Sequence, residues 1–272
     1  MPLTLDSVTF GYTPDTPVVR GVSASLHDGR FTAVLGPNAA GKSTLLKLML
    51  GQLRPNAGRL TLAGEAIASI PPRRRARRIS YVPQRGSVSF AFTVRRVVAM
   101  GRFSHGDPVE GGPAVDAALA ALQLDALADR PFHELSGGQQ QRVLLARAVA
   151  QSREGGRVML LDEPAAGLDL RHVHEAMRLV RTLAAGGLAV AVVMHDLSLA
   201  ARYADDVWLI DRGELTAAGP WDAVMTTDVL EPVYGVPLRR LELGGKSAGE
   251  SAGGAAGESS RPVFVAEPTG VH

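Results

Sequence analysis

The stretch that most constrains the fold of this chain is GPNAAGKST, at residues 36–44. It fits the pattern G-x-x-x-x-G-K-[ST] of a phosphate-binding loop, in which backbone N–H groups surround a polyphosphate at the start of a helix. An apolar run at residues 32–35 precedes it, and a helix-like run at residues 45–50 follows it. A glycine-rich turn beside a surface lysine is the alternative, but it does not account for the strand and helix on either side.

The residue types within this loop predict their roles. Lys42 is expected to bind the β- and γ-phosphates of a triphosphate, and the Ser43 hydroxyl is expected to hold Mg²⁺. Tyr12 lies upstream, where its ring could stack on an adenine or could be a half-buried residue at a strand end. The sequence leaves both interpretations of Tyr12 open. The predicted nucleotide-binding residues of the loop are Gly36, Pro37, Asn38, Ala39, Ala40, Gly41, Lys42, Ser43 and Thr44.

Composition limits the class of protein. The chain has 272 residues, 46% of them apolar, enough to bury the core of one large domain or two modest ones. No apolar run approaches the ~20 residues that a membrane helix needs, and the first ten residues lack a secretory signal pattern, so we expect a cytosolic location. The absence of cysteine excludes disulfides, thiol catalysis and cysteine-ligated metals.

The pattern of apolar runs predicts the fold class. Short alternating runs at residues 3–5, 8–10 and 22–26 predict an N-terminal antiparallel β region. Buried runs at residues 158–161 and 189–194 alternate with helical stretches, which predicts a mostly parallel sheet. The chain is therefore expected to be an α/β protein with the core of a P-loop NTPase.

Two further segments differ from this core. Helical periodicity within residues 85–150 predicts a helical subdomain inserted into the core. Residues 1–243 are therefore predicted to be one ATP-binding domain. Residues 244–272 begin with a Gly-, Ala- and Ser-rich stretch that cannot bury a core, so we expect a flexible tail, with a short docking strand at residues 263–265.

A basic run, RRRARR, occupies residues 73–78. Such a run can bind nucleic acid. No aromatic residue is interleaved with it, the net charge of the chain is only +2, and an apolar strand at residues 79–82 follows at once. We therefore interpret the run as a solvated face beside an internal strand, and we predict no nucleic-acid partner.

Charged residues follow the two buried strands. Asp162 and Glu163 come after residues 158–161, and His195 comes after residues 189–194. Pro164 excludes Glu163 from helical geometry, so both carboxylates should lie at the carboxyl end of the strand, where open α/β sheets bind ligands. We predict that Asp162 positions Mg²⁺, that Glu163 accepts a proton from an attacking water, and that His195 contacts the γ-phosphate. A strand-end turn and a lone structural histidine are the alternatives, but together these residues describe phosphoryl transfer to water.

A second candidate anion site is LSGGQ, at residues 135–139. A serine and two glycines at a helix start expose N–H groups to an anion. One chain would then carry two anion sites for one nucleotide. Two copies packed head to tail would use both sites, with each ATP lying between them. The residues predicted to form this site are Ser136, Gly137, Gly138 and Gln139.

These motifs, in this order, resemble the ATP-binding subunits of ABC transporters over about residues 3–240. The resemblance implies a homodimer that closes on two molecules of MgATP and opens after hydrolysis. It also implies that Gln84 links the γ-phosphate and the metal to the helical subdomain, where integral-membrane permease subunits dock at the cytoplasmic face of the membrane. Asp169, in the matched pair Leu168-Asp169, is assigned to the nucleotide site by the same resemblance. The matched motifs are the phosphate loop, YVPQ at 81–84, LSGGQ at 135–139, Asp162-Glu163, Leu168-Asp169 and His195.

Within that family, the sequences at residues 77–84, 92–94, 100–105 and 196–205 resemble the importers of iron-siderophore, haem or cobalamin. This finer resemblance implies uptake of an iron chelate, haem or a ferric siderophore, with a substrate-binding protein as an indirect partner. It does not decide the cargo. Transport of another cargo or export, a soluble ATP-driven clamp on nucleic acid, and a regulator without turnover remain alternative hypotheses.

The chain departs from the family pattern at two places. Ala39 stands where the family usually has glycine, and a positive φ there would cost alanine about 1–2 kcal/mol. The sequence Ala165-Ala166-Gly167 replaces the commoner Thr or Ser residues, so a hydroxyl contact of that turn is expected to be lost. Neither departure removes a group that the chemistry requires.

Overall fold

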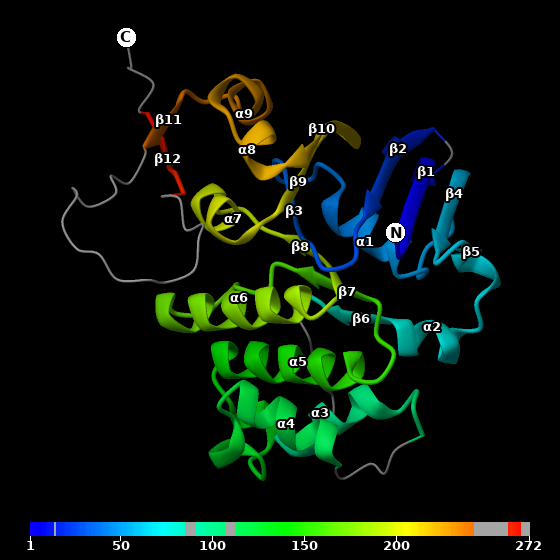
Figure 1. Ribbon diagram of the computed structural model, residues 1–272, viewed down its shortest axis with the longest axis vertical. Helices are drawn as coiled ribbons and strands as arrows, with labels where there is room; N and C mark the ends of the chain where they lie inside the picture. The colour runs from blue at the N-terminus through cyan, green and yellow to red at the C-terminus, as the bar shows by residue number, and fades with distance from the viewer. Residues whose placement is uncertain (14, 85–90, 107–111, 242–260, 268–272) are drawn as a thin grey trace, which may run out of the picture.

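The computed structural model describes residues 1–13, 15–84, 91–106, 112–241 and 261–267. At its centre is a six-stranded sheet with the order β10-β9-β3-β8-β7-β6 (Figure 1). Neighbouring strands run parallel, except that β9 and β10 form an antiparallel hairpin. The predicted mostly parallel α/β sheet is therefore confirmed. Its strands are β3 (Phe31–Leu35), β6 (Ile79–Val82), β7 (Val158–Asp162), β8 (Ala189–Val193), β9 (Asp206–Asp211) and β10 (Glu214–Pro220).

Helices cover both faces of this sheet, which explains why its inner strands are continuous apolar runs. Every residue of β3, β7 and β8 is buried. Along β3, the side chains of Phe31 and Ala33 join one core cluster, and that of Val34 joins the other. The first cluster includes residues of α5 (Gly137–Ser152), α6 (Leu170–Ala185) and α7 (Leu197–Tyr203), and the second includes residues of α1 (Lys42–Met49).

The N-terminal β region is a four-stranded antiparallel sheet with the order β2-β1-β4-β5. The two strands predicted at residues 3–5 and 8–10 are one strand with an irregularity between them. At that point Ser7 has a φ of 48° and its N–H donates to the Ser23 hydroxyl at 2.8 Å, so the ladder is interrupted without ending the strand. The strands are β1 (Leu3–Thr13), β2 (Thr16–Leu26), β4 (Ala57–Leu62) and β5 (Glu65–Ala66).

The helical part forms the lower region of Figure 1, where α3 and α4 pack against α5. Helix α5 begins at Gly137, directly after Ser136, which caps it with its side chain. The elements are α3 (Val94–Ala99), η2 (Met100–Arg102), α4 (Pro113–Ala121), η3 (Asp125–Leu127) and η4 (Phe132–Glu134), followed by α5.

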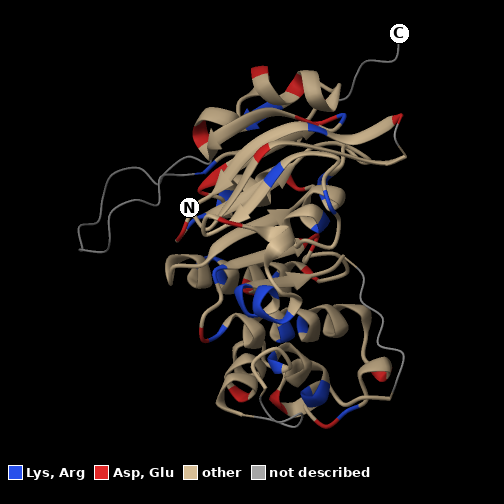
Figure 2. Ribbon diagram, turned by 90° about the vertical axis from the view of Figure 1, so that its right-hand side faces the viewer, with Lys and Arg blue, Asp and Glu red and all other residues tan. Residues whose placement is uncertain are grey.

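The basic run at residues 73–78 forms most of α2 (Pro72–Arg78), which follows η1 (Ile67–Ser69) and appears as a blue helix near the middle of Figure 2. Its interpretation as a merely solvated face is incomplete. Arg73 and Arg77 both donate to the carbonyl of Ser104, at 3.0 and 2.7 Å. These side chains therefore tie α2 to the helical part of the molecule. Arg74 and Arg78 pair with Glu65 instead.

The apolar positions within residues 221–236 suggest one helix, but the structure has two, α8 (Trp221–Val224) and α9 (Thr227–Tyr234). Met225 and Thr226 leave helical geometry between them, and the bend buries the Met225 side chain completely. The predicted strand near residues 263–265 is confirmed as β12 (Val263–Ala266), which pairs with β11 (Leu238–Leu241). The predicted flexible stretch at residues 244–260 lies outside the described residues. Within the described residues, no helix has the length and apolar character needed to cross a bilayer.

Candidate active site

The phosphate loop connects β3 to α1 and is held by close backbone contacts. A Cβ on Gly36 would lie 1.9 Å from the carbonyl oxygen of Ile210, and one on Gly41 would lie 2.6 Å from that of Val18. Only glycine fits such approaches. Asn38 and Ala39 are exposed at the tip of the loop, and Ala39 has a φ of 61°. This alanine therefore does adopt the left-handed conformation whose cost was considered above.

Lys42 lies inside the curve of the loop with only 5% of its surface exposed. Its Nζ donates to the carbonyls of Gly36 and Pro37, both at 2.7 Å. Burial lowers the pKa of Lys42, and the nearby carboxylates of Glu163 and Asp162 oppose that shift. The ammonium is thus held at the centre of a ring of backbone groups, where a phosphate oxygen would receive both its charge and the N–H groups of the helix start.

Ser43 and Asp162 come from α1 and the end of β7 and meet at the edge of the sheet. The Ser43 hydroxyl donates to Oδ1 of Asp162 at 3.1 Å, and Asp162 is 4% exposed. Burial raises the pKa of Asp162, with Glu163 adding a smaller repulsion. Two hard oxygen donors beside the phosphate loop fit the ligand chemistry of Mg²⁺, so this pair is the candidate metal site.

The carboxylate of Glu163 contacts both of the other predicted catalytic residues. Nε2 of Gln84 donates to its Oε2 at 2.6 Å, and Nε2 of His195 lies 2.5 Å from its Oε1. The three side chains follow β6, β7 and β8, which are neighbours in the sheet. Glu163 has a φ of 48°, so Pro164 does exclude right-handed helix, although the backbone is left-handed rather than extended. Strain of this kind costs about 1–3 kcal/mol and concentrates at functional sites.

The LSGGQ stretch forms the start of α5. The Ser136 hydroxyl accepts from the N–H of Gln139 at 3.3 Å, and Oε1 of Gln139 accepts from the N–H of Ser136 at 3.0 Å. Gly138 packs closely on the turn after Glu163, because a Cβ there would lie 2.9 Å from the Gly167 carbonyl oxygen. Among the described residues, no hydrogen bond joins this stretch to the phosphate loop. The fold therefore does not bring the two predicted anion sites together within one chain.

Tyr12 and Asp169 occupy positions at the margin of the site. Tyr12 is 61% exposed rather than half-buried, and its hydroxyl lies 3.4 Å from that of Thr44. Its ring meets that of Phe10 edge-on. Asp169 caps α6 by accepting from the N–H of His172 at 2.9 Å. The exposed ring of Tyr12 is thus available for stacking beside the phosphate loop.

Tyr234 belongs to the site but was not found from the sequence. The N–H of Gly36 donates to its hydroxyl at 3.1 Å. Burial raises the pKa of Tyr234, so the hydroxyl stays neutral and can accept this bond. It stands 198 positions away along the chain, on α9, and no local motif marks it.

A groove of about 410 Å³ separates α2 from the helical part and is lined by Arg147, Phe103 and Tyr81 among others. Phe103 is 79% exposed. Arg147 makes no hydrogen bond or ion pair with any described residue, and burial lowers its pKa. No described carboxylate lines the groove. A partly buried cation whose side chain has no partner among the described residues predicts that something else supplies one.

Comparisons with known proteins agree with this geometry. A family model described as ABC transporter matches residues 19–166. The chain is 42% identical over 224 residues to the hemin import ATP-binding protein HmuV of Pseudomonas entomophila, which covers 81% of this chain and 88% of that protein. It is 43% identical over 224 residues to the cobalamin import ATP-binding protein BtuD of Halobacterium salinarum, which covers 80% of this chain and 55% of that protein. A metal-chelate type ABC transporter, solved in an inward-facing conformation, shares the fold with a TM-score of 0.77 and 29% identity over 98% of this chain and 97% of its own.

Proposed function

The chain belongs to the ABC transporter family as an ATP-hydrolysing subunit, and we propose that it powers the import of an iron chelate, haem or a ferric siderophore, through separate membrane permease subunits. The similarity to hemin import subunits supports this cargo class. The similarity to a cobalamin import subunit favours cobalamin as the second candidate. Import subunits among the relatives give no support to a soluble clamp or to a regulator without turnover.

The observation that carries the proposal is the carboxylate of Glu163, held between Gln84 and His195 beside the Ser43–Asp162 pair. Two hydrogen-bond donors fix a carboxylate in one orientation, which suits a group that accepts a proton from water at a set position. Gln84 and His195 would then respond to the γ-phosphate through the same carboxylate. In this proposal Glu163, His195 and Gln84 are the catalytic residues.

The remaining side chains would bind the cofactors. Lys42 and the N–H groups of residues 36–44 would hold the phosphates of ATP, and Tyr12 would stack on its adenine. Ser43, Asp162 and Gln84 would hold Mg²⁺, which supplies charge stabilisation to the transferred phosphoryl group when bound. Asp169 is assigned to the nucleotide site by the family resemblance, and its capping bond keeps its carboxylate at the start of α6.

Subunits of this family dimerise and work with permease subunits. We propose a head-to-tail homodimer in which Ser136, Gly137, Gly138 and Gln139 of one copy reach the nucleotide held by the other. The exposed start of α5 supports this arrangement, because its capping box engages the N–H groups of Ser136 and Gln139 and leaves those of Gly137 and Gly138 for an anion.

The unpaired Arg147 and the exposed Phe103 make the groove of the helical part the proposed docking site of the permease. Its complement would be an apolar segment that carries a carboxylate and faces the cytoplasmic side of the membrane. Replacing a buried unpaired charge by an apolar side chain commonly stabilises a protein. Arg147→Met should therefore raise the melting temperature of the isolated subunit and weaken co-purification with the permease. The Arg95→Met variant changes an arginine outside the groove, which pairs with Asp116, and should leave co-purification unchanged. A lower melting temperature for Arg147→Met would reject the docking role.

The cargo is tested by ATP hydrolysis in the transporter reconstituted in proteoliposomes with its substrate-binding protein. Haem, a ferric siderophore and cobalamin are supplied separately on the side of the binding protein. We expect an iron chelate to accelerate phosphate release and to accumulate inside the vesicles. Acceleration by cobalamin alone would select the second candidate, and outward movement would reject import.

A further inference from the structure

Helix α7 begins two residues after His195, and its position determines where that histidine points. Asp196 caps the helix by accepting from the N–H of Leu199 at 2.9 Å. The helix has only seven residues. Helices this short are marginal by themselves, so contacts with the rest of the protein set their position. The geometry between His195 and Glu163 therefore depends on what holds α7.

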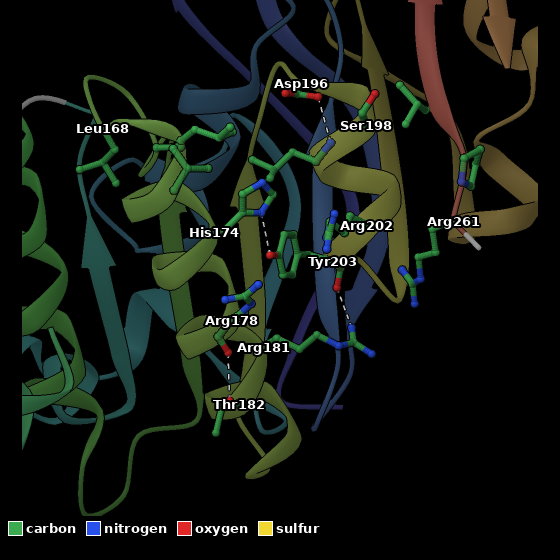
Figure 3. A pocket seen from close by; sticks show the side chains of 16 residues that line it. Leu168, His174, Arg178, Arg181, Thr182, Asp196, Ser198, Arg202, Tyr203 and Arg261 are labelled. Carbon is green, nitrogen blue, oxygen red and sulfur yellow. Dashed lines mark hydrogen bonds between the residues drawn. The ribbon is translucent and has the colours of Figure 1, made fainter. Parts of the chain in front are cut away.

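A groove of about 1270 Å³ runs along α6, α7 and the segment that begins at Arg261 (Figure 3). On the side of α6, the hydroxyl of Tyr203 bonds Nδ1 of His174 at 2.8 Å, and Arg181 donates to the carbonyl of Tyr203 at 2.6 Å. Arg181 also pairs with Asp205. These contacts fix only the last turn of α7 on this side.

Arg261 holds the same end of α7 from the opposite side of the groove. One guanidinium nitrogen donates to the carbonyls of Ala201 and Ala204, at 2.8 and 2.7 Å. These oxygens belong to the last turn and the cap of the helix, where carbonyls lack helical partners and a cation is favourable. The guanidinium carbon also lies 4.8 Å over the ring of Trp221. Burial, with Arg181 nearby, lowers the pKa of Arg261.

The segment that follows Arg261 is attached to the other end of α7. The N–H of Phe264 donates to the hydroxyl of Ser198, in the first turn, at 3.0 Å. Strand β12 is itself fixed by pairing with β11 from Leu238 to Leu241. Residues 261–266, which we call the C-terminal clip, therefore span α7 and bind both its first and its last turn.

We propose that the C-terminal clip holds α7, and through it His195, in register with Glu163, which makes Arg261 a positioning residue for ATP hydrolysis. The inference rests on the proposed roles of Glu163 and His195. Arg261 does not touch the reacting groups, so its removal should leave nucleotide binding intact and reduce only the chemical step.

The test uses the full chain with Arg261→Ala. We expect kcat for ATP hydrolysis to fall about tenfold, because small misplacements of catalytic groups cost one to two orders of magnitude, while KM for ATP stays unchanged. Arg261→Lys should restore much of the activity, since an ammonium can also donate to two carbonyls. Arg239→Ala is the matched control, because Arg239 is exposed on β11 and forms no bond with a described residue. Its kcat should equal that of the unmodified chain.

Release of the clip can be observed independently of activity. The chain has two tryptophans, and Trp208 is 3% exposed, so a change in emission on substitution at Arg261 reports Trp221. We expect Arg261→Ala to shift the emission to longer wavelength. An unchanged kcat together with that shift would overturn the proposal.

A double-mutant cycle separates positioning from general stability. In a His195→Ala background, Arg261→Ala should lower kcat no further, because the group that it positions is gone. The same fall in both backgrounds would overturn the proposal. If Arg261→Ala does not fold, Ser198→Ala replaces it in the cycle. Failure of the proposed catalytic site is distinguishable, since His195→Ala alone would then leave kcat unchanged.

Discussion

Two helices of this molecule begin with a glycine-rich sequence suited to an anion, and they are built in different ways. Helix α1 has Gly41 as its N-cap, without a side-chain cap; Gly41 lies next to the buried Lys42 and packs against β2, and Gly36 of the preceding loop packs against β9. Helix α5 begins with the exposed Ser136 in a complete capping box. The first start is surrounded by the catalytic groups of its own chain, and the second is not. This difference supports the proposal that one nucleotide lies between the α1 start of one copy and the α5 start of another.

Backbone strain follows the same division. Near the α1 start, Ala39 and Glu163 have positive φ values of 61° and 48°. At the α5 start, Ser136 has an ordinary extended backbone, with a φ of −61°. Strained residues persist where surrounding structure over-determines them, as at catalytic sites. The positive φ values near the α1 start therefore fit the proposed catalytic site, whereas the α5 start is an unstrained helix terminus.

The largest expected effect comes from Glu163→Gln. This variant leaves the starts of α1 and α5 unchanged and stops only the hydrolysis of ATP, so it tests whether both starts bind the same nucleotide. Loss of a general base should slow ATP hydrolysis by about 10²–10⁴-fold. The glutamine can still accept from Gln84, so MgATP should still bind. Since each nucleotide would then join two copies and persist, the variant should form a dimer with MgATP, measured by light scattering beside a phosphate-release assay.

Glu175→Gln is the control for that variant, because Glu175 pairs with the exposed Arg171 on α6, away from the candidate catalytic residues. It should hydrolyse ATP at the normal rate. A Glu163→Gln protein that remains monomeric with MgATP, even with its permease, would break the assignment of the α5 start to a second copy.

The next effect compares one glycine from each start. Gly36→Ala places a Cβ 1.9 Å from the Ile210 carbonyl oxygen, so β9 and the loop must separate. A substitution of this kind should lower the free energy of unfolding by about 3 kcal/mol or more and abolish ATP binding. Gly137→Ala meets nothing within 4 Å and should leave the stability of the isolated subunit unchanged. Chemical denaturation of both variants measures the difference, and equal losses would contradict the distinction between the two starts.

Much of this site was predictable because the sequence motifs lie directly beside the buried strands that position them. Asp162, Glu163 and His195 each follow a strand that is apolar throughout, so topology alone brought them to one edge of the sheet. Gln84 was assigned by family resemblance, and its bond to Glu163 fits that role. The bulge at Ser7 and the break at Met225 were not predicted, because tertiary packing determines them and no local signal marks them.

Long-range partners were the other part that the sequence could not supply. The bond from Gly36 to Tyr234 and the clip from Arg261 to Ala201 join segments 198 and 60 positions apart. The basic run of α2 is solvated as predicted, but its bonds to the carbonyl of Ser104 were missed for the same reason, since Ser104 lies outside its local sequence. Single arginines and tyrosines carry no periodic signal that reveals such partners.

Ser136→Ala tests whether the α5 start has a second role besides capping. Loss of an N-cap hydroxyl should lower the free energy of unfolding by about 1 kcal/mol. Thr93→Ala is a matched control, because Thr93 caps α3 by accepting from the N–H of Arg96 at 3.3 Å. Both variants should melt at similar temperatures. Only Ser136→Ala should weaken the MgATP-dependent dimer, and an equal effect of both on dimerisation would reduce the α5 start to a structural cap.

The smallest expected effect is also the most direct measure of how far the α1 start is formed in advance. A left-handed alanine costs about 1–2 kcal/mol in the folded state, and glycine removes this cost. Glycine also raises the entropy of the unfolded chain, which offsets part of the stabilisation, so Ala39→Gly should stabilise the subunit by about 0.5–1 kcal/mol. Ala63→Gly is the control, since Ala63 is exposed, has a φ of 51° and lies in a turn after β4. It should show the same stabilisation.

If the loop has one conformation with and without nucleotide, Ala39→Gly relieves the same strain in both states, and Kd for ATP should not change. A tighter Kd, with no gain in stability, would instead mean that Ala39 becomes left-handed only when ATP binds, and the α1 start would then resemble the α5 start in depending on its ligand.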